Sequence, residues 1–240
     1  MRAAFPGFPR EGIEFFRGLA RHNTREWFLP RKSVFEAQVK QPMRQLVEAL
    51  NAFLARFAPE HITDPDAAIY RFYRDTRFSP DKTPYKDRIA ANFPRHGLTR
   101  HDGAGYYFSV SNKEVAVGGG LYMPSPETLA AVRRHLASSH EAFRRISRAA
   151  GLRRLLGEAQ GDRLVRTPKG FPSDHPAADL LQFKQVYFYV ELPPDLATTD
   201  ALCGEIASRF RAMAPFMNFL NDPLAARRKA VAANDFFDEM

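Results

Sequence analysis

Apolar side chains recur at helical spacing through the first sixty residues, which predicts a helical N-terminal part at about 10–60. One apolar stripe there steps by three and four residues and indicates a long amphipathic helix; its members are Phe35, Val39, Met43, Leu46, Leu50, Phe53 and Phe57. Pro42 lies inside this stripe, and because proline has no N–H to donate, we expect the helix to kink or split there. Upstream, the run Asn-Thr-Arg-Glu at 23–26 indicates a capped helix start.

Beyond residue 65 the pattern changes to short segments rich in Tyr, Phe, Ile and Val, which is typical of β-strands. We predict strands at 68–74 and 88–93, with an irregular loop between them because of Pro80 and Pro84. A hairpin is predicted from 106–110 and 115–117, closed around residues 111–113 and followed by three consecutive glycines.

The remaining half of the chain indicates mainly helices. Ser125, Pro126 and Glu127 combine an N-cap, a first-turn proline and an acid, which predicts a helix start. A second capping pattern at 138–141 predicts another helix, a short helix is expected to run through 180–181, and 186–190 is the clearest strand. A last amphipathic helix is predicted from Leu202 to Leu220, with Pro215 near its end. The acidic tail after 230, around Asp235, Asp238 and Glu239, is expected to fray.

The order of these elements is helices, strands, helices, one strand and a final helix, which is not the alternation of βαβ units. We therefore expect an α+β fold with an antiparallel or mixed sheet packed with helices. A chain of 240 residues that is 45% hydrophobic can bury a substantial core, and it has no repeat or clear linker. We predict one compact domain over 1–240, with the helical part at about 10–60 and a mixed α+β part at about 65–222.

Several features of the composition bear on location and partners. No stretch approaches 18 uninterrupted apolar residues, the N-terminus lacks the apolar run of a secretory signal, and the single cysteine, Cys203, excludes an internal disulfide. We therefore expect a cytoplasmic protein without a membrane partner. The net charge is +8, and residues 1–100 carry 18 Lys and Arg against 11 Asp and Glu. Such a basic half attracts nucleic acids, phosphorylated metabolites or acidic proteins, or is simply a solvated arginine-rich surface.

The most unusual segment is 71–86, which holds three Arg, two Lys, two Asp and two Tyr. Arginine presents a planar fork to two oxygens and lysine a mobile point charge, so the mixture suits a phosphate or carboxylate. We predict a concave basic pocket for an anionic small molecule. The ligand-binding candidates are Arg71, Arg74, Arg77, Lys82, Lys86 and Tyr73. Tyr73 and Tyr85 would hydrogen-bond or stack on the ligand, and Asp75, Tyr85 and Asp81 are the acid–base candidates if a reaction is catalysed.

Two alternatives compete with the pocket. One is a structural protein in which Asp75 and Asp81 hold the cations in an ion-pair network that locks the loop; five clustered cations make this less favoured, because desolvating like charges is costly. The other is an open basic face that binds nucleic acid or an acidic protein. Because the chain has no helix-turn-helix, zinc or RNP signature, nucleic acid is possible but less favoured.

Other chemical signals are weaker. The backbone of Gly119 and Gly120 would cradle an anion, although a bulge or tight bend at a strand end is the favoured interpretation. Cys203 lies on the buried edge of a helix, which favours an inert thiol. The sequence has no H-E-x-x-H or G-x-S-x-G pattern, so we predict no metal site and name no cofactor. Enzymatic activity and oligomeric state stay open.

Segment 71–86 also resembles the signature R-x-x-R-D-x-R-F-x-x-x-K-x-P-Y-K of a bacterial and fungal family of conserved hypothetical proteins, domain of unknown function 2461. All nine signature residues are present: Arg71, Arg74, Asp75, Arg77, Phe78, Lys82, Pro84, Tyr85 and Lys86. The resemblance spans nearly the whole chain, because the family's Asn-x-x-x-Trp-Phe opening is similar to 23–28 and its Pro-x-Gly-x-Pro-x-x-His-Pro stretch to 168–176. It implies no activity and assigns no role to any residue.

Overall fold

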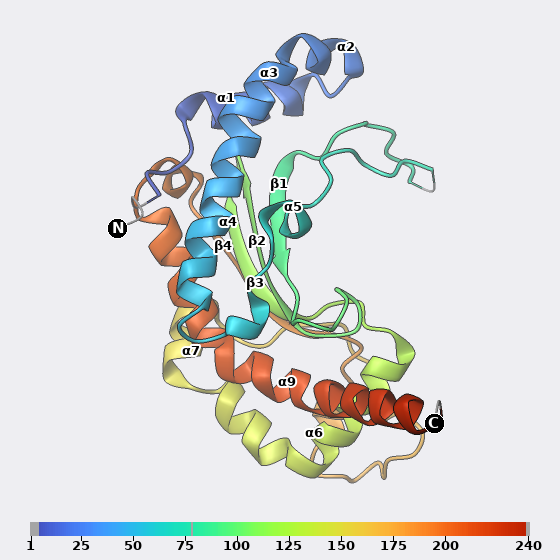
Figure 1. The fold of residues 1–240 in the computed structure, drawn as a ribbon. Helices are drawn as coiled ribbons and strands as arrows, with labels where there is room; N and C mark the ends of the chain where they lie inside the picture. The colour runs from blue at the N-terminus through green and yellow to red at the C-terminus, as the bar shows by residue number, and fades with distance from the viewer. Residues whose placement is uncertain (1–4, 78, 239–240) are drawn as a thin grey trace. The chain divides into compact units, whose positions relative to one another are not determined.

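The computed structural model describes residues 5–77 and 79–238, with side chains described through residue 225. It is an α+β fold, about 50% helix and 15% strand, with a four-stranded antiparallel sheet, so the predicted class is confirmed. The strands lie side by side in chain order (Figure 1), and they are β1 (Arg88–Phe93), β2 (Gly105–Ser111), β3 (Val115–Leu121) and β4 (Val186–Leu192). The predicted strand at 88–93, the hairpin and the strand at 186–190 are all present.

Short extended segments cover both edges of this sheet. Beside β1, Ile69 forms an isolated antiparallel bridge with Ala91. Beside β4, Gln160 pairs with Tyr187, and the two residues exchange backbone hydrogen bonds of 2.7 and 3.0 Å. Because exposed strand edges are templates for unwanted pairing, these segments protect the sheet.

The N-terminal part is helical, as predicted, but it is divided into several pieces. They are α1 (Arg10–Arg21), α2 (Arg25–Phe28), η1 (Leu29–Arg31), α3 (Lys32–Phe35), η2 (Glu36–Lys40), α4 (Gln41–Leu54), η3 (Pro59–His61) and α5 (Pro65–Ala68). Thr24 caps α2 by accepting a hydrogen bond from the Trp27 N–H. The predicted break in the long helix is a π-helical turn, η2, immediately before Pro42, whose missing N–H is tolerated in the first turn of α4.

The predicted strand at 68–74 is wrong. Residue 68 ends α5, and the chain beyond it makes only isolated bridges, including one between Tyr73 and Tyr85. Hydrogen bonds flank that pair, from the Arg74 N–H to the Pro84 carbonyl at 2.9 Å and from the Lys86 N–H to the Phe72 carbonyl at 3.0 Å. Pro84 has no N–H to return, so a continuous ladder cannot extend past this point.

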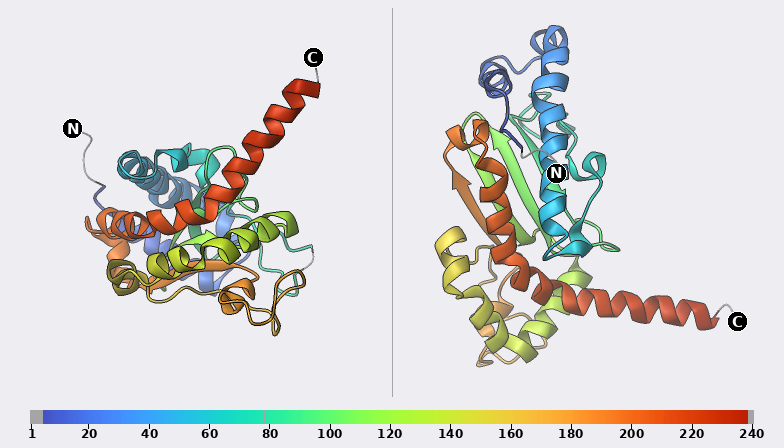
Figure 2. Two further views of the ribbon diagram at one scale, coloured as in Figure 1. Left: turned by 90° about the horizontal axis from the view of Figure 1, so that it is seen from below. Right: turned by 60° about the vertical axis from the view of Figure 1, so that its left-hand side comes forward.

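The C-terminal half contains α6 (Pro126–Ser147), α7 (Ala150–Leu156), α8 (Ala178–Leu181), η4 (Pro194–Thr198) and α9 (Leu202–Asp238). Ser125 caps α6, as predicted, and the second capping pattern is a kink within α6 at Ser139 rather than a new start. The end of the last helix near Leu220 is wrong, because α9 continues through Pro223 as one long helix (Figure 2). Of the acidic tail, Glu239 lies outside the described residues, and its fraying stays a prediction.

The chain divides into two compact units. The first comprises Met1–Phe93, Tyr107–Val117 and Val190–Ser208, and the second Pro94–Tyr106, Gly118–Tyr189 and Arg209–Met240. An aromatic cluster around Phe28 and Phe72 forms the core of the first unit, and Phe188 and Phe216, 4.9 Å apart, belong to the core of the second. The single-domain prediction is not tested by this division and stays a prediction. None of the described helices is long and apolar enough to span a membrane.

Candidate functional site

Residues 71–86 form a projecting two-stranded segment, which we call the arm. The structure describes all of it except residue 78. The two halves run antiparallel through the Tyr73–Tyr85 bridge and extend away from β1 and α5 (Figure 1). The segment that the sequence singled out is therefore one structural element, within the first compact unit.

The root of the arm is fixed by aromatic packing. Phe72 and Tyr85 are buried, and their rings stack at a centroid distance of 5.6 Å. Phe28 lies 4.2 Å from Tyr85, and Phe35 lies 4.3 Å from Phe72. These contacts join the arm to α2 and α3, because Phe28 ends α2 and Phe35 ends α3. The arm is consequently held at a defined place on the first unit rather than attached only through its covalent ends.

Ion pairs and hydrogen bonds brace the outer part of the arm. Arg74 Nη1 donates to the Asp81 carboxylate and, at 3.0 Å, to the Thr83 hydroxyl, so it links the two halves. Arg77 donates to Asp75 through Nε at 3.0 Å and Nη2 at 2.7 Å, which is a bidentate fork.

Lys82 adds a third brace, because its Nζ donates to the Thr76 carbonyl at 2.9 Å. Three of the five predicted cations thus have partners inside the arm. This is the arrangement that the ion-pair alternative requires for Asp75 and Asp81.

These partners determine the protonation of the two carboxyl groups. Hydrogen bonds from the Arg77 side chain and then from its backbone N–H lower the pKa of Asp75 to about 2. Hydrogen bonds from the Thr83 backbone and hydroxyl, followed by Arg74, lower the pKa of Asp81. Both groups are therefore ionised at neutral pH and have no proton to give, and they are far too weakly basic for efficient general-base catalysis.

The third acid–base candidate, Tyr85, is buried to 1% exposure. Burial raises the pKa of its hydroxyl, and so does nearby Tyr73, whereas the charge of nearby Arg25 lowers it. A phenol with a raised pKa stays protonated at neutral pH. Its packing and hydrogen bonds identify Tyr85 as an anchor of the arm.

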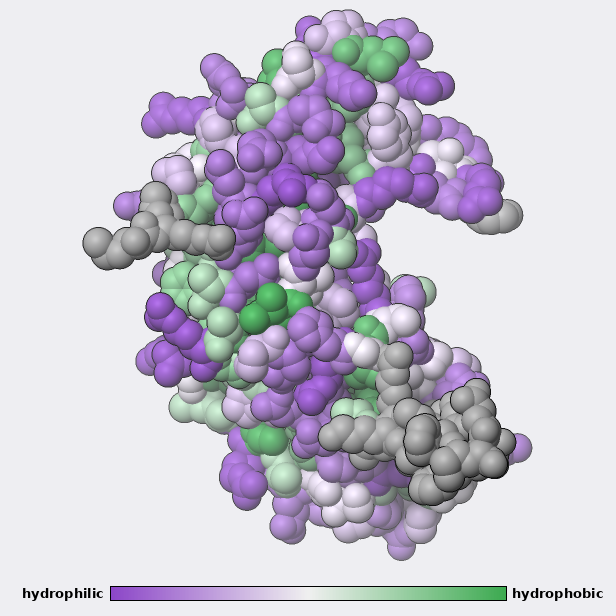
Figure 3. Space-filling model, viewed as in Figure 1, coloured by the Kyte–Doolittle hydropathy of each residue, from purple (hydrophilic) through white to green (hydrophobic). Residues whose placement is uncertain are grey.

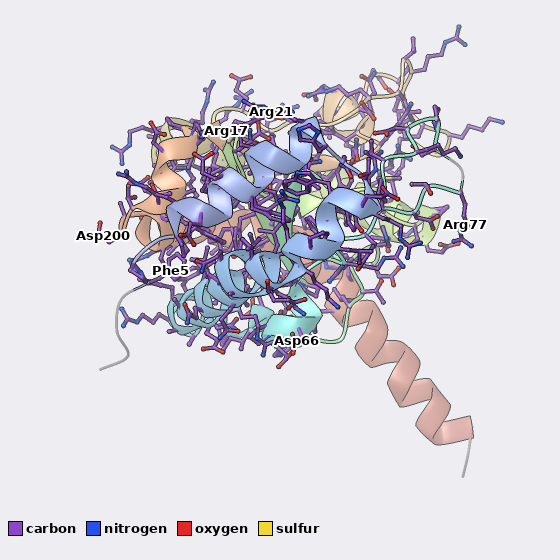
Figure 4. All side chains as sticks on the ribbon, turned by 90° about the horizontal axis from the view of Figure 1, so that it is seen from above. Phe5, Arg17, Arg21, Asp66, Arg77 and Asp200 are labelled. Atoms are coloured by element: carbon purple, nitrogen blue, oxygen red, sulfur yellow. The ribbon has the colours of Figure 1, made fainter. Side chains whose placement is uncertain are left out.

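Other predicted ligand-binding residues face solvent. Arg71 is exposed and makes no hydrogen bond or ion pair with any residue that the structure describes, and Tyr73 is 47% exposed. Lys86 Nζ lies 5.2 Å from the centre of the Tyr70 ring. The surface of the arm is strongly hydrophilic (Figure 3), and Arg77 lies at its outer end (Figure 4). With five cations against two carboxylates, the arm carries a formal charge of +3.

Gly119 and Gly120 belong to the second compact unit, inside β3 rather than after it. Gly120 has a φ of +140°, and a Cβ there would lie 2.5 Å from the Val186 carbonyl oxygen of β4. A Cβ at Gly119 would lie 2.2 Å from Cε of Met217 in α9. These glycines permit close approach of neighbouring elements, which accounts for them without a ligand. Their predicted anion-binding role stays a prediction.

The described residues give no support for a metal site or for Cys203 as a nucleophile. No group of three or more His, Cys, Asp or Glu side chains suited to a metal gathers in the described part of the chain. Asp87 lies 3.7 Å from both Lys113 and Arg88. Cys203 is buried, and burial raises the pKa of its thiol to about 11, so it stays protonated as an inert core residue would.

Sequence reasoning missed Asn23 and Arg25 as contributors to this region. Asn23 bonds the backbone of Tyr85 on both its N–H and its carbonyl, and the charge of Arg25 acts on the Tyr85 hydroxyl. Both residues lie about sixty positions before Tyr85, where they resemble an ordinary helix start. No local pattern could have linked them to Tyr85.

One family model, described as "Conserved hypothetical protein (DUF2461)", matches residues 11–219 of the chain. The match includes the whole arm and the three glycines of β3. No curated protein and no solved structure matches.

Proposed function

This chain belongs to the family of conserved hypothetical proteins DUF2461, and on that premise we propose that its arm binds a phosphate-bearing ligand on an open basic face. The observation that carries the proposal is the charge left after the internal pairs are formed. Asp75 and Asp81 are already occupied by Arg77 and Arg74, yet the arm still presents a formal excess of three positive charges on exposed or half-exposed side chains.

The spread of the cations favours a ligand with several phosphates over one with a single anionic group. Lys86 lies beside Phe72 at the root, and Lys82 contacts Thr76 farther out. Four residues of extended chain span up to about 13 Å. One carboxylate cannot reach both ends, whereas a chain of phosphates can. An open face also replaces the predicted concave pocket in this proposal, because the side chains of Arg71, Tyr73, Arg77 and Lys82 are exposed.

The second candidate is that the ion pairs only lock the arm in place. The bidentate Arg77–Asp75 contact and the contacts of Arg74 favour it, because they consume donors that a ligand would need. Both candidates accept Arg74 as a brace, so replacing Arg74 cannot separate them. Replacing Arg71 can, because among the described residues it makes no hydrogen bond or ion pair that would hold the arm together.

The test is a calorimetric titration of the protein with inorganic polyphosphate at low salt. Arg71→Ala is compared with Arg154→Ala, an exposed arginine of α7 that makes no ion pair among the described residues. Loss of a charge-assisted contact worth about 1 kcal/mol at an exposed site weakens binding roughly 5-fold in Arg71→Ala. The control variant should bind like wild type. Absence of wild-type binding, or equal effects of the two variants, would favour the locking candidate.

Location is part of the same proposal. A single buried cysteine needs no oxidising environment. We therefore place the protein in the cytoplasm, which fractionation of cells that express it would test.

A further inference from the structure

Tyr73 is the one residue of the arm, among those described, that combines a rigidly held aromatic ring with a largely exposed surface. Its ring lies 5.3 Å from Tyr85 and 6.4 Å from Phe28, measured between centroids. Those two rings are buried to 1% exposure each, while Tyr73 remains 47% exposed. Tyr73 therefore packs against the buried cluster and keeps about half of its surface open to solvent.

The hydroxyl of Tyr73 makes no hydrogen bond with any described residue. Because this hydroxyl has no partner among the described residues, it does not hold the Tyr73 side chain in position. What it offers to a ligand is the ring itself, at the root of a basic segment.

Cations flank this ring along the chain. Arg71, two residues before Tyr73, is exposed and has no hydrogen bond or ion pair in the described structure. The Asp75–Arg77 pair begins two residues after Tyr73. Two residues of chain span at most about 7 Å. An exposed guanidinium and a partly exposed aromatic ring therefore lie within reach of one short strand of nucleic acid.

We propose that the phosphate-bearing ligand of the arm is a single-stranded nucleic acid, with a base stacked on Tyr73 and a backbone phosphate bound by Arg71. This inference rests on the proposed function and names its ligand class. Proteins that bind single strands without sequence preference combine basic tracks with stacking aromatics. Stacking needs no recognition helix or zinc module, so the lack of such signatures in this chain does not count against it.

The same features disfavour other polyanions. Bases in a duplex are stacked on one another and cannot lay a face on Tyr73. Inorganic polyphosphate has no aromatic group, so it would use the cations alone. Single strands are the polyanions that use both features at once.

A purely structural role for Tyr73 is the competing explanation, because it forms a cross-strand pair with Tyr85. Two variants separate the roles. Tyr73→Phe keeps the ring, and it loses only a hydroxyl that has no partner among the described residues. Tyr73→Ile keeps a β-branched apolar side chain for the cross-strand pair but has no aromatic face. Thermal unfolding followed by circular dichroism confirms that each variant folds.

The experiment measures fluorescence anisotropy of a short fluorescein-labelled oligothymidylate, with inorganic polyphosphate and a DNA duplex of equal length as comparison ligands. Tyr73→Ile should weaken oligothymidylate binding by about 5- to 150-fold, the range of base–aromatic stacking, and leave polyphosphate binding unchanged. Tyr73→Phe should bind like wild type, and Arg71→Ala should weaken both ligands.

The outcomes that would contradict the proposal differ in which ligands still bind and in which variants lose affinity. If wild type binds polyphosphate and the duplex at least as tightly as the oligothymidylate, and Tyr73→Ile changes nothing, the stacking inference is wrong while phosphate binding stands. If wild type binds none of the three ligands, the proposed function fails as well. Equal losses in Tyr73→Ile for oligothymidylate and polyphosphate would assign Tyr73 to the structure of the arm.

Discussion

The amide of Asn23 makes both hydrogen bonds that a neighbouring strand would make to Tyr85. Its Nδ2 donates to the Tyr85 carbonyl at 2.9 Å, and its Oδ1 accepts from the Tyr85 N–H at 3.1 Å. The backbone of Tyr85 thus has its partners at the place where Pro84 prevents a continuous ladder. A single side chain from the start of α2 consequently sets the position of the arm's root.

Two further asparagines in the described part of the chain bond a backbone N–H and carbonyl in the same way, and we predict that the stability each contributes increases with its burial. Asn51 makes two such bonds to Thr63, and Asn221 makes them to Ala104. Asn221 is fully buried, so Asn221→Ala leaves two buried backbone groups unsatisfied and should cost about 2–4 kcal/mol. Asn23→Ala and Asn51→Ala, at part-buried sites, should cost about 1–2 kcal/mol. Urea unfolding of the three variants measures this; a smaller loss for Asn221→Ala would refute the ranking.

Arg74 and Asp81 should be only weakly coupled, because both side chains are partly exposed. We expect a coupling energy of about 0.2–1 kcal/mol from a double-mutant cycle with Arg74→Ala and Asp81→Ala. Chemical denaturation of wild type, the two single variants and the double variant gives the four free energies of unfolding that the cycle needs. A coupling energy above this range would mean that the Arg74–Asp81 contact contributes substantially to stability. A coupling energy of zero would mean that it contributes nothing.

The Asp75–Arg77 pair predicts a pH dependence with a definite sign. Because the folded pKa of Asp75, about 2, lies below its ordinary 3.8, the pair stabilises the arm at every pH above that ordinary value. The contribution declines as the pH falls from about 4 towards 2. An NMR titration of the Asp75 side-chain carboxyl carbon should show a midpoint near 2 in wild type and a higher one in Arg77→Ala. An ordinary midpoint in wild type would show that the fork does not persist in solution.

The glycines of β3 should behave differently from an exposed helical glycine. In Gly120→Ala the methyl group would meet backbone atoms of β4 in a conformation that L-residues rarely adopt, so we expect a loss of about 2 kcal/mol or more. Gly151 in α7 has no atom within 4 Å of the position that an added methyl group would occupy, and Gly151→Ala should stabilise by about 0.5–1 kcal/mol. Thermal unfolding compares the two. Unchanged stability in Gly120→Ala would reopen a ligand-binding explanation for this glycine.

Features that depend on local sequence were predictable. Thr24 and Ser125 cap their helices as expected, and two short segments rich in strand-forming residues on either side of 111–113 identified the hairpin. The prediction of a strand at 68–74 was wrong because strand formation also depends on the segment that pairs with it. Here that segment contains Pro84. The predicted end of the last helix was wrong because α9 continues through both of its prolines, Pro215 and Pro223.

The density of charge in 71–86 made this segment the candidate site, which stays a prediction, and the less favoured ion-pair alternative already had Asp75 and Asp81 hold cations. Which cation meets which carboxylate was not predictable, because Arg74 reaches across the arm to Asp81 while Arg77 folds back on Asp75. The difference between Arg71, which faces solvent, and Arg74, which is a brace, appears only in three dimensions. Arg71 and Arg74 therefore have different roles in the structure, although they look alike in the sequence.

The salt dependence of oligothymidylate binding tests the central claim most directly. We predict that the logarithm of the wild-type association constant falls linearly with the logarithm of salt concentration, and that Arg71→Ala reduces the slope by about 0.7, the value for one phosphate contact on a single strand. Arg154→Ala should leave the slope unchanged. A wild-type affinity that does not respond to salt, or a slope that Arg71→Ala does not alter, would contradict phosphate binding by the arm.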